Sequence, residues 1–131
     1  LSSRRVIYLP KFSLMEDWEL DFRWLRLRHF VKDRFKKNEL PDLNALLFLI
    51  GIQELGQLRT KFTKEEKQDL MHIAVCRLLS TDGYYTFDGL DTEGWPHWVR
   101  TKQLPFRGVA DQAAYLKEKI ISYFADIFEE E

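Results

Sequence analysis

The chain has 131 residues, of which 45% are hydrophobic and 15% aromatic, and its formal net charge at pH 7 is −1. A chain of this length typically forms one domain, which buries roughly two-thirds of the surface that the unfolded chain exposes. The near-zero net charge argues against a surface built as a whole for nucleic acid or for an acidic membrane, so any charge-based function has to be local. With a single cysteine, no intramolecular disulfide can form.

No segment has the length of a membrane span. The longest apolar run covers residues 45–52, far short of the roughly 20 residues that a helical span needs. No secretory signal is visible, and the single cysteine favours a reducing compartment. We therefore expect one helical domain over residues 1–131, cytoplasmic and without a membrane partner.

The first third of the chain predicts an arm followed by a long helix. Residues 1–12 lack a helical pattern and are expected to form an extended arm that packs over the helices. Ser13 and Glu16 have the spacing of a capping box, in which the hydroxyl and the carboxylate satisfy backbone amides at a helix start. We expect the first helix over residues 14–37, with Asn38 as its stop. Alternating apolar and charged residues early in this segment also fit a strand, but the length and the cap favour a helix.

Two further helices are expected in the middle of the chain. Residues 42–58 are entered through a proline and are apolar on every side, which predicts a buried helix at the centre of the domain. Thr63 and Glu66 form the second capping box and the clearest helix start in the sequence. The helix that follows is expected to end near residues 82–83, where an aspartate and a glycine stand.

The last helix is expected to begin near Gly108 and Asp111. Its core stripe recurs at helical spacing and consists of Val109, Ala113, Leu116, Ile120, Phe124 and Ile127. Before it, residues 84–106 are rich in aromatic residues and glycine and are longer than an ordinary connection. The predicted fold class is all-α: a four-helix bundle-like domain around residues 45–52, with an extended N-terminal arm. A long aromatic-rich loop joins the third and fourth helices, and a short β-hairpin within it also fits the pattern.

The first helix carries one apolar stripe more than a surface helix needs. The first stripe consists of Leu20, Trp24, Leu27, Val31 and Phe35. The second stripe lies roughly 140° away around the helix, at 3.6 residues per turn. It consists of Trp18, Phe22, Leu25 and His29. Another layer, the N-terminal arm (Val6, Ile7, Leu9, Phe12) or a partner has to cover the second stripe. The leading hypothesis is a non-catalytic interaction module that binds a protein partner or itself through Trp18, Phe22 and Leu25 and through residues 84–98.

The aromatic segment supports a second hypothesis, a small-ligand-binding protein or an enzyme. Aromatic walls with a few convergent polar groups are typical of small-molecule and peptide sites. The candidate wall residues are Tyr84, Tyr85, Trp95, His97 and Trp98, with Asp88, Asp91 and Glu93 as polar anchors. The alternative is that these rings only cap the helical core and that the glycines serve turns.

A third hypothesis is phosphate or nucleic-acid binding through one stripe of the first helix, which carries Arg23, Arg26, Arg34 and Lys37. Basic residues among aromatic ones suit phosphates and single-stranded nucleic acid. The helix also has acids in its first turns and bases later, an order that stabilises any helix through its dipole. Nucleic acid is therefore not favoured as a partner.

No metal or cofactor is expected. His72 and Cys76 are four residues apart, which is ligand spacing for zinc, but a structural zinc site needs four ligands and no second pair occurs. The acids around Asp88 and Asp91 lack the spacing and the distal glutamate of an EF-hand. No catalytic residue can be assigned from a motif, so the sequence leaves open whether the protein is an enzyme.

Overall fold

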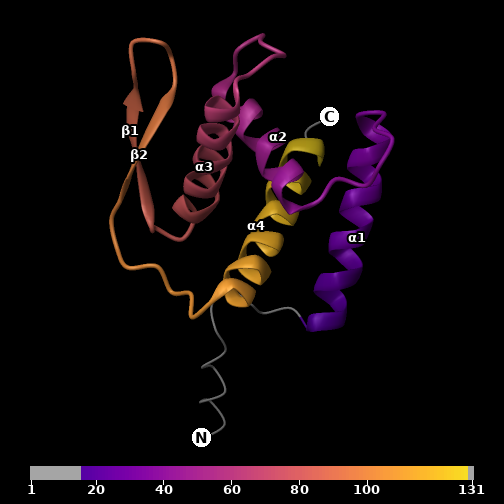
Figure 1. Cartoon of the computed structure of the whole chain (residues 1–131). Helices are drawn as coiled ribbons and strands as arrows, with labels where there is room; N and C mark the ends of the chain where they lie inside the picture. The colour runs from indigo at the N-terminus through magenta and orange to yellow at the C-terminus, as the bar shows by residue number, and fades with distance from the viewer. Residues whose placement is uncertain (1–15, 130–131) are drawn as a thin grey trace, which may run out of the picture. The chain divides into compact units, whose positions relative to one another are not determined.

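A computed structural model describes residues 16–129, so the predicted arm, residues 1–12, and Ser13 lie outside the described residues. Along the chain follow α1 (Asp17–Arg34), α2 (Leu43–Leu55), α3 (Lys64–Ser80), β1 (Tyr85–Leu90), β2 (Pro96–Arg100) and α4 (Val109–Glu129) (Figure 1). The chain divides into two compact units. Unit 1 contains α1 and α4, and unit 2 contains α2, α3 and the two strands.

In unit 2, α2 packs against α3. Asp42 caps α2 by accepting the N–H of Ala45 at 2.9 Å, and Gly56 ends it in the left-handed conformation at φ 68°. Thr63 and Glu66 make the predicted capping box at the start of α3. A capping box satisfies two backbone amides that a helix start leaves without a partner, which confirms this part of the sequence analysis.

Gly51 sets how closely α2 approaches α3. A Cβ atom at this position would lie 2.2 Å from the backbone oxygen of Leu70 and 2.8 Å from its Cβ. Such distances are far below van der Waals contact, and the backbone of a packed helix cannot yield as a flexible side chain does. The two helices therefore pack at this distance only because residue 51 has no side chain.

β1 and β2 form a two-stranded antiparallel sheet that packs on α3. Phe87 pairs with Trp98 across the strands, with ring centroids 5.5 Å apart and an edge-to-face angle of 65°. The register shifts between Phe87 and Leu90, next to Gly89 at φ 91°. A glycine at positive φ is typical of such a bulge, because other residues adopt this conformation only with strain.

In unit 1, α1 packs against α4. The buried face of α1 consists of Leu20, Trp24 and Val31, and that of α4 includes Tyr115, Leu116, Ile120 and Phe124. Two ring contacts join the helices: Lys117 Nζ lies 5.6 Å from the centre of the Trp24 ring, and the Phe30 and Phe128 rings meet edge to face at 4.7 Å. Each helix thus buries one side against the other.

The predicted all-α, four-helix bundle-like fold is wrong. The described residues contain a two-stranded antiparallel sheet, and their helices pack as one pair in unit 1 and another in unit 2. Within the aromatic-rich segment, residues 85–100 form a hairpin, which confirms the short β-hairpin that the pattern also allowed. An apolar pattern shows which side of a helix is buried without identifying the helix that covers it. The apolar character of α2 therefore does not place it at the centre of a bundle.

Several predicted helix ends also need correction. α1 begins at Asp17 rather than residue 14, because Glu16 is extended, and it ends at Arg34, with Lys36 rather than Asn38 in the left-handed conformation.

Val109, predicted in the core stripe of α4, is 84% exposed. None of the helices within residues 16–129 combines the length and apolar character that crossing a membrane requires.

Candidate functional site

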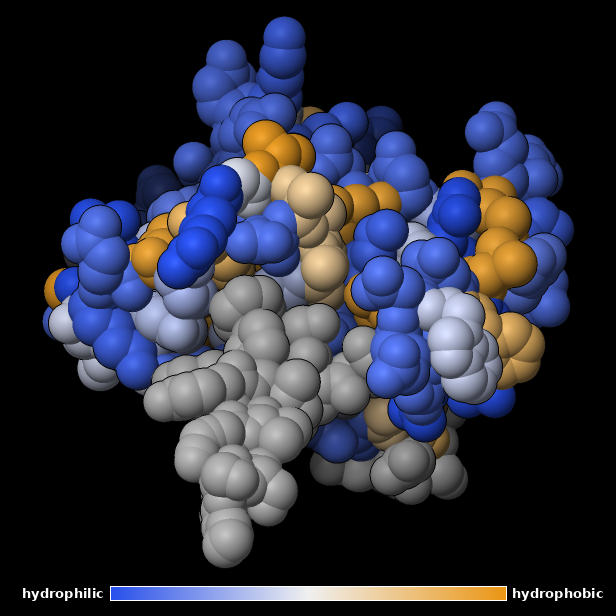
Figure 2. All heavy atoms as spheres, turned by 90° about the horizontal axis from the view of Figure 1, so that it is seen from below, coloured by the Kyte–Doolittle hydropathy of each residue, from blue (hydrophilic) through white to orange (hydrophobic). Residues whose placement is uncertain are grey.

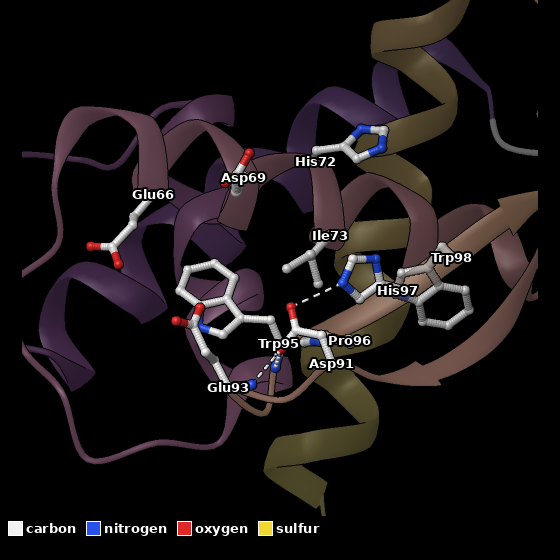
Figure 3. A pocket seen from close by; sticks show the side chains of 10 residues that line it. All are labelled: Glu66, Asp69, His72, Ile73, Asp91, Glu93, Trp95, Pro96, His97 and Trp98. Carbon is white, nitrogen blue, oxygen red and sulfur yellow. Dashed lines mark hydrogen bonds and ion pairs between the residues drawn. The ribbon is translucent and has the colours of Figure 1, made fainter.

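A pocket of about 380 Å³ lies between α3 and the hairpin in unit 2 (Figure 3). We call it the hairpin pocket, and its lining consists of Glu66, Asp69, His72, Ile73, Asp91, Glu93, Trp95, Pro96, His97 and Trp98. The α3 residues recur at helical spacing and so share one side of that helix. The hairpin supplies the rest from the turn between its strands and from β2.

Asp91 organises the turn between the strands. Its Oδ1 accepts the backbone N–H groups of Glu93 at 2.9 Å and Trp95 at 3.0 Å. Its Oδ2 lies 3.0 Å from Nε2 of His97 (Figure 3), and because an ionised carboxylate only accepts, the imidazole donates this bond. The bonds to His97 and to the Trp95 amide, in this order, lower the pKa of the Asp91 carboxyl.

The charges of the pocket are predominantly negative. Glu66 is already engaged: its Oε1 accepts a bond from Arg59 Nη2 at 2.7 Å and from the Thr63 amide at 2.9 Å, and these bonds lower its pKa. Asp69 and Glu93 are exposed, and their carboxylates form no hydrogen bond or ion pair within residues 16–129. The hydrogen bond to Glu66, and then the charges of Glu66 and Glu93, raise the pKa of the Arg59 guanidinium. The lining within the described chain contains neither lysine nor arginine.

Trp95 joins the pocket to the core of unit 2. It is half-buried and packs against the cluster of Leu55, Leu70 and Ile73 while it also lines the pocket. In Figure 3 its ring lies next to Glu93, on the side of the pocket away from Trp98. The backbone oxygen of Glu93 accepts a bond from Gln57 Nε2 at 3.0 Å, which ties the turn to the segment after α2.

The pocket lacks an activated nucleophile. Cys76 Sγ lies 3.5 Å from Nε2 of His72, the geometry that a cysteine–histidine pair would need. The thiol is fully buried, however, and burial raises its pKa to about 11. A thiol with this pKa stays protonated at neutral pH and is a poor nucleophile.

Unit 1 offers a second candidate surface, the outer face of α1, which consists of Trp18, Phe22, Leu25 and His29. The exposed fractions of the first three are 69%, 58% and 46%, and His29 is also exposed. Figure 2 shows apolar side chains reaching the surface among hydrophilic ones on the right, where α1 lies in Figure 1. Large apolar side chains grouped on one exposed face mark interaction sites more often than chance exposure does.

The four predicted anion-binding residues have different surroundings. Arg23 pairs with Glu19 at 2.9 Å, and the Arg26 and Arg34 guanidinium groups lie over the Phe22 and Phe128 rings at 5.6 and 5.9 Å. Lys37 is exposed beyond the end of α1. Arg23 and Arg26 do line a groove of about 600 Å³ between α1 and α4, which is otherwise apolar: Leu27, Phe30, Ile121, Phe124, Ala125 and Phe128.

The other predicted aromatic residues divide between pocket and core. Trp95, His97 and Trp98 line the hairpin pocket, whereas Tyr84 is 5% exposed in the core and Tyr85 contacts the His72 ring edge to face at 6.4 Å. Sequence reasoning missed Glu66 and Asp69 as pocket residues. Their helical spacing showed that they share a side of α3, but no local signal showed that the hairpin faces this side.

Within residues 16–129, no three His, Cys, Asp or Glu side chains converge closely enough to hold a metal ion. Comparison of the chain with protein-family models, with curated proteins and with solved structures finds no significant match.

Proposed function

We propose that the protein is a non-catalytic interaction module that associates with a second copy of itself through the outer face of α1. The observation that carries this proposal is the exposure of Trp18, Phe22 and Leu25 on the side of α1 that does not pack on α4. Removing three large apolar side chains from water favours association, because burial is worth about 25 cal/mol per Å² of apolar surface.

The spacing along this face is that of a helix–helix seam. Trp18, Phe22, Leu25 and His29 follow one another at intervals of four, three and four residues. This is the alternation with which the inner positions of a coiled coil recur. α1 can therefore place all four side chains against a second helix without bending away from it.

Charge complementarity supports a second copy as the partner and favours an antiparallel direction. The first turns of α1 are acidic and the later turns basic, so an antiparallel pair places unlike charges opposite one another, whereas a parallel pair would align the acidic ends. One flank of the seam carries Glu19 and Arg26. In an antiparallel pair with two-fold symmetry, Glu19 of each copy faces Arg26 of the other.

The size of the face predicts a weak dimer. α1 has 18 residues and is therefore about 27 Å long, and one side of such a helix buries less than the roughly 800 Å² per partner of a standard interface. We expect a dissociation constant on the order of tens of micromolar. Sedimentation or light scattering from about 1 to 500 µM covers the transition.

A charge exchange tests both the partner and the direction. Glu19→Arg or Arg26→Glu alone places like charges opposite one another twice in each dimer, and each should weaken self-association at least about tenfold. An equimolar mixture of the two variants restores both unlike pairs, so it should form a mixed dimer close to wild-type affinity. Glu39→Arg, the same charge change at an exposed residue outside α1, is the matched control and should leave association unchanged.

Two results would overturn the proposal. One is a wild-type chain that stays monomeric throughout this range; if deletion of residues 1–12 then produces a dimer, the chain's own arm is the occupant instead. The other is a mixture of the two variants that associates no better than either variant alone, because complementary charges would then have no part in the contact.

A further inference from the structure

We propose that the hairpin pocket binds an organic cation, specifically an alkylammonium or guanidinium group. This inference goes beyond self-association, since every residue of the pocket belongs to unit 2 and every residue of the proposed seam belongs to unit 1. The volume of about 380 Å³ falls in the range of about 300–1,000 Å³ that small-ligand pockets occupy.

The aromatic wall is the first reason for this ligand class. Trp95 and Trp98 both line the pocket and are half-buried. An ammonium or guanidinium group is attracted to the face of an indole, and tryptophan is the side chain that attracts cations most strongly. Trp95 is supported from behind by Leu55, Leu70 and Ile73, so its position needs little reorganisation when a ligand arrives.

The charge of the pocket is the second reason. Arg59 compensates the charge of Glu66, and Asp91 is engaged with His97 and two backbone amides. The exposed carboxylates of Asp69 and Glu93 form no hydrogen bond or ion pair within the described residues and can attract a cation. Arg59, whose guanidinium the charge of Glu93 also stabilises, lies outside the lining, which contains neither lysine nor arginine. The negative charge of the pocket would repel an anionic ligand.

The arrangement of these carboxylates selects an organic cation over a metal ion. A metal needs several oxygen or nitrogen ligands at short, fixed distances, and the described residues contain no such group of three. Separate carboxylates beside aromatic rings instead suit a larger cation, whose charge is spread and whose apolar part packs on indole. The same chemistry is presented by a free polyamine-like molecule and by an arginine or lysine side chain in a peptide.

The turn is held in place before any ligand binds. Asp91 fixes the amides of Glu93 and Trp95, and Gln57 holds the Glu93 carbonyl oxygen from the segment after α2. The two side chains that we assign to cation contact on the hairpin, Glu93 and Trp95, therefore extend from a fixed backbone. Such preorganisation reduces the entropic cost of binding.

Titration of the full-length protein with agmatine tests the proposal, and an N-acetylated, C-amidated Gly-Arg-Gly peptide forms the second arm. Tryptophan fluorescence and calorimetry should show saturable binding of agmatine at a stoichiometry of one, with a dissociation constant between about 0.1 and 5 mM. Tighter binding of the peptide than of agmatine identifies a side chain of a partner as the source, and the reverse order identifies a free amine.

The matched variants locate the site. Asp69→Asn combined with Glu93→Gln removes two charges from exposed side chains and should weaken agmatine binding at least about tenfold. Glu65→Gln, an exposed acid on α3 outside the lining, should leave the affinity unchanged. Circular dichroism checks that all variants keep the wild-type fold.

The proposal is overturned if butyrate, which has the opposite charge and a similar chain, produces the same fluorescence change as agmatine. It is equally overturned if the double variant and Glu65→Gln bind agmatine as the wild type does. In either case the response would come from ionic strength or from another surface.

Discussion

In unit 2, α2 is apolar on every side and packs against α3, and Trp95 of the hairpin joins their core. In unit 1, the described residues form a pair of helices, α1 and α4. The consequence appears in the exposed residues: Trp18, Phe22 and Leu25 of α1 stay on the surface, whereas five residues of α2 are buried. A pair of helices covers only one side of each member, and an apolar second side is left over.

The difference also separates the two proposed functions. In unit 1, the exposed feature is the apolar outer face of α1, which favours association with another helix; the charges of α1 only set the direction of that helix. In unit 2, the exposed feature is the negative charge beside the aromatic rings of the hairpin pocket, which favours binding of a small cationic group. We therefore expect the largest loss of stability from a substitution in the packed core. A smaller loss should follow from a change in the hydrogen bonds of the turn, and the smallest from a substitution of an exposed apolar side chain.

The largest effect should come from Gly51→Ala. Its Cβ would overlap the Leu70 backbone, and although alanine favours a helix by up to about 1 kcal/mol, forced overpacking against backbone should cost about 3 kcal/mol net. Thermal unfolding followed by circular dichroism should show a midpoint roughly 10 °C lower. Gly108→Ala, where the new Cβ meets open space, is the control and should change the midpoint by less than about 2 °C. Equal midpoints for both variants would contradict the close packing of α2 on α3.

A smaller, local effect should follow from protonating Asp91. Its folded-state pKa lies below its ordinary value of 3.8, so the ionised carboxylate stabilises the turn above the ordinary value, and this contribution is lost as the pH falls through the folded-state pKa. Hydrogen-exchange protection of the Glu93 and Trp95 amides should be constant well above the ordinary carboxyl pKa and decline as the pH falls below it, while α4 amides serve as the reference. Asp91→Ala should lack this protection at every pH; retained protection would contradict the assigned role.

The smallest effect on folding should come from Phe22→Ser. This side chain is 58% exposed, so at concentrations where the chain is monomeric the free energy of unfolding should change by no more than about 0.5 kcal/mol. Ile120→Ser, at a fully buried residue of the same unit, should cost several times more. Denaturant titration measures both, and a large loss for Phe22→Ser would mean that the outer face of α1 is part of the folding core.

The local signals in the sequence determined most of the helix positions. The Thr63–Glu66 capping box, the apolar character of residues 43–55 and the periodicity of α4 each involve residues within a few positions of one another, and such interactions form largely independently of the rest of the chain. The second apolar stripe of α1 was visible for the same reason, because it depends only on helical spacing.

Tertiary structure alone decided which helices pair, and which residues share the hairpin pocket. Asp69 and Glu93 are brought to one pocket by the packing of the hairpin on α3, and their own neighbours in the sequence carry no sign of it. The pairing of Phe87 with Trp98 depends in the same way on a register that the bulge at Gly89 shifts. Hydrophobic burial is non-directional, so a pattern specifies that a side is covered without specifying by what; packing and backbone pairing between distant segments supply that choice.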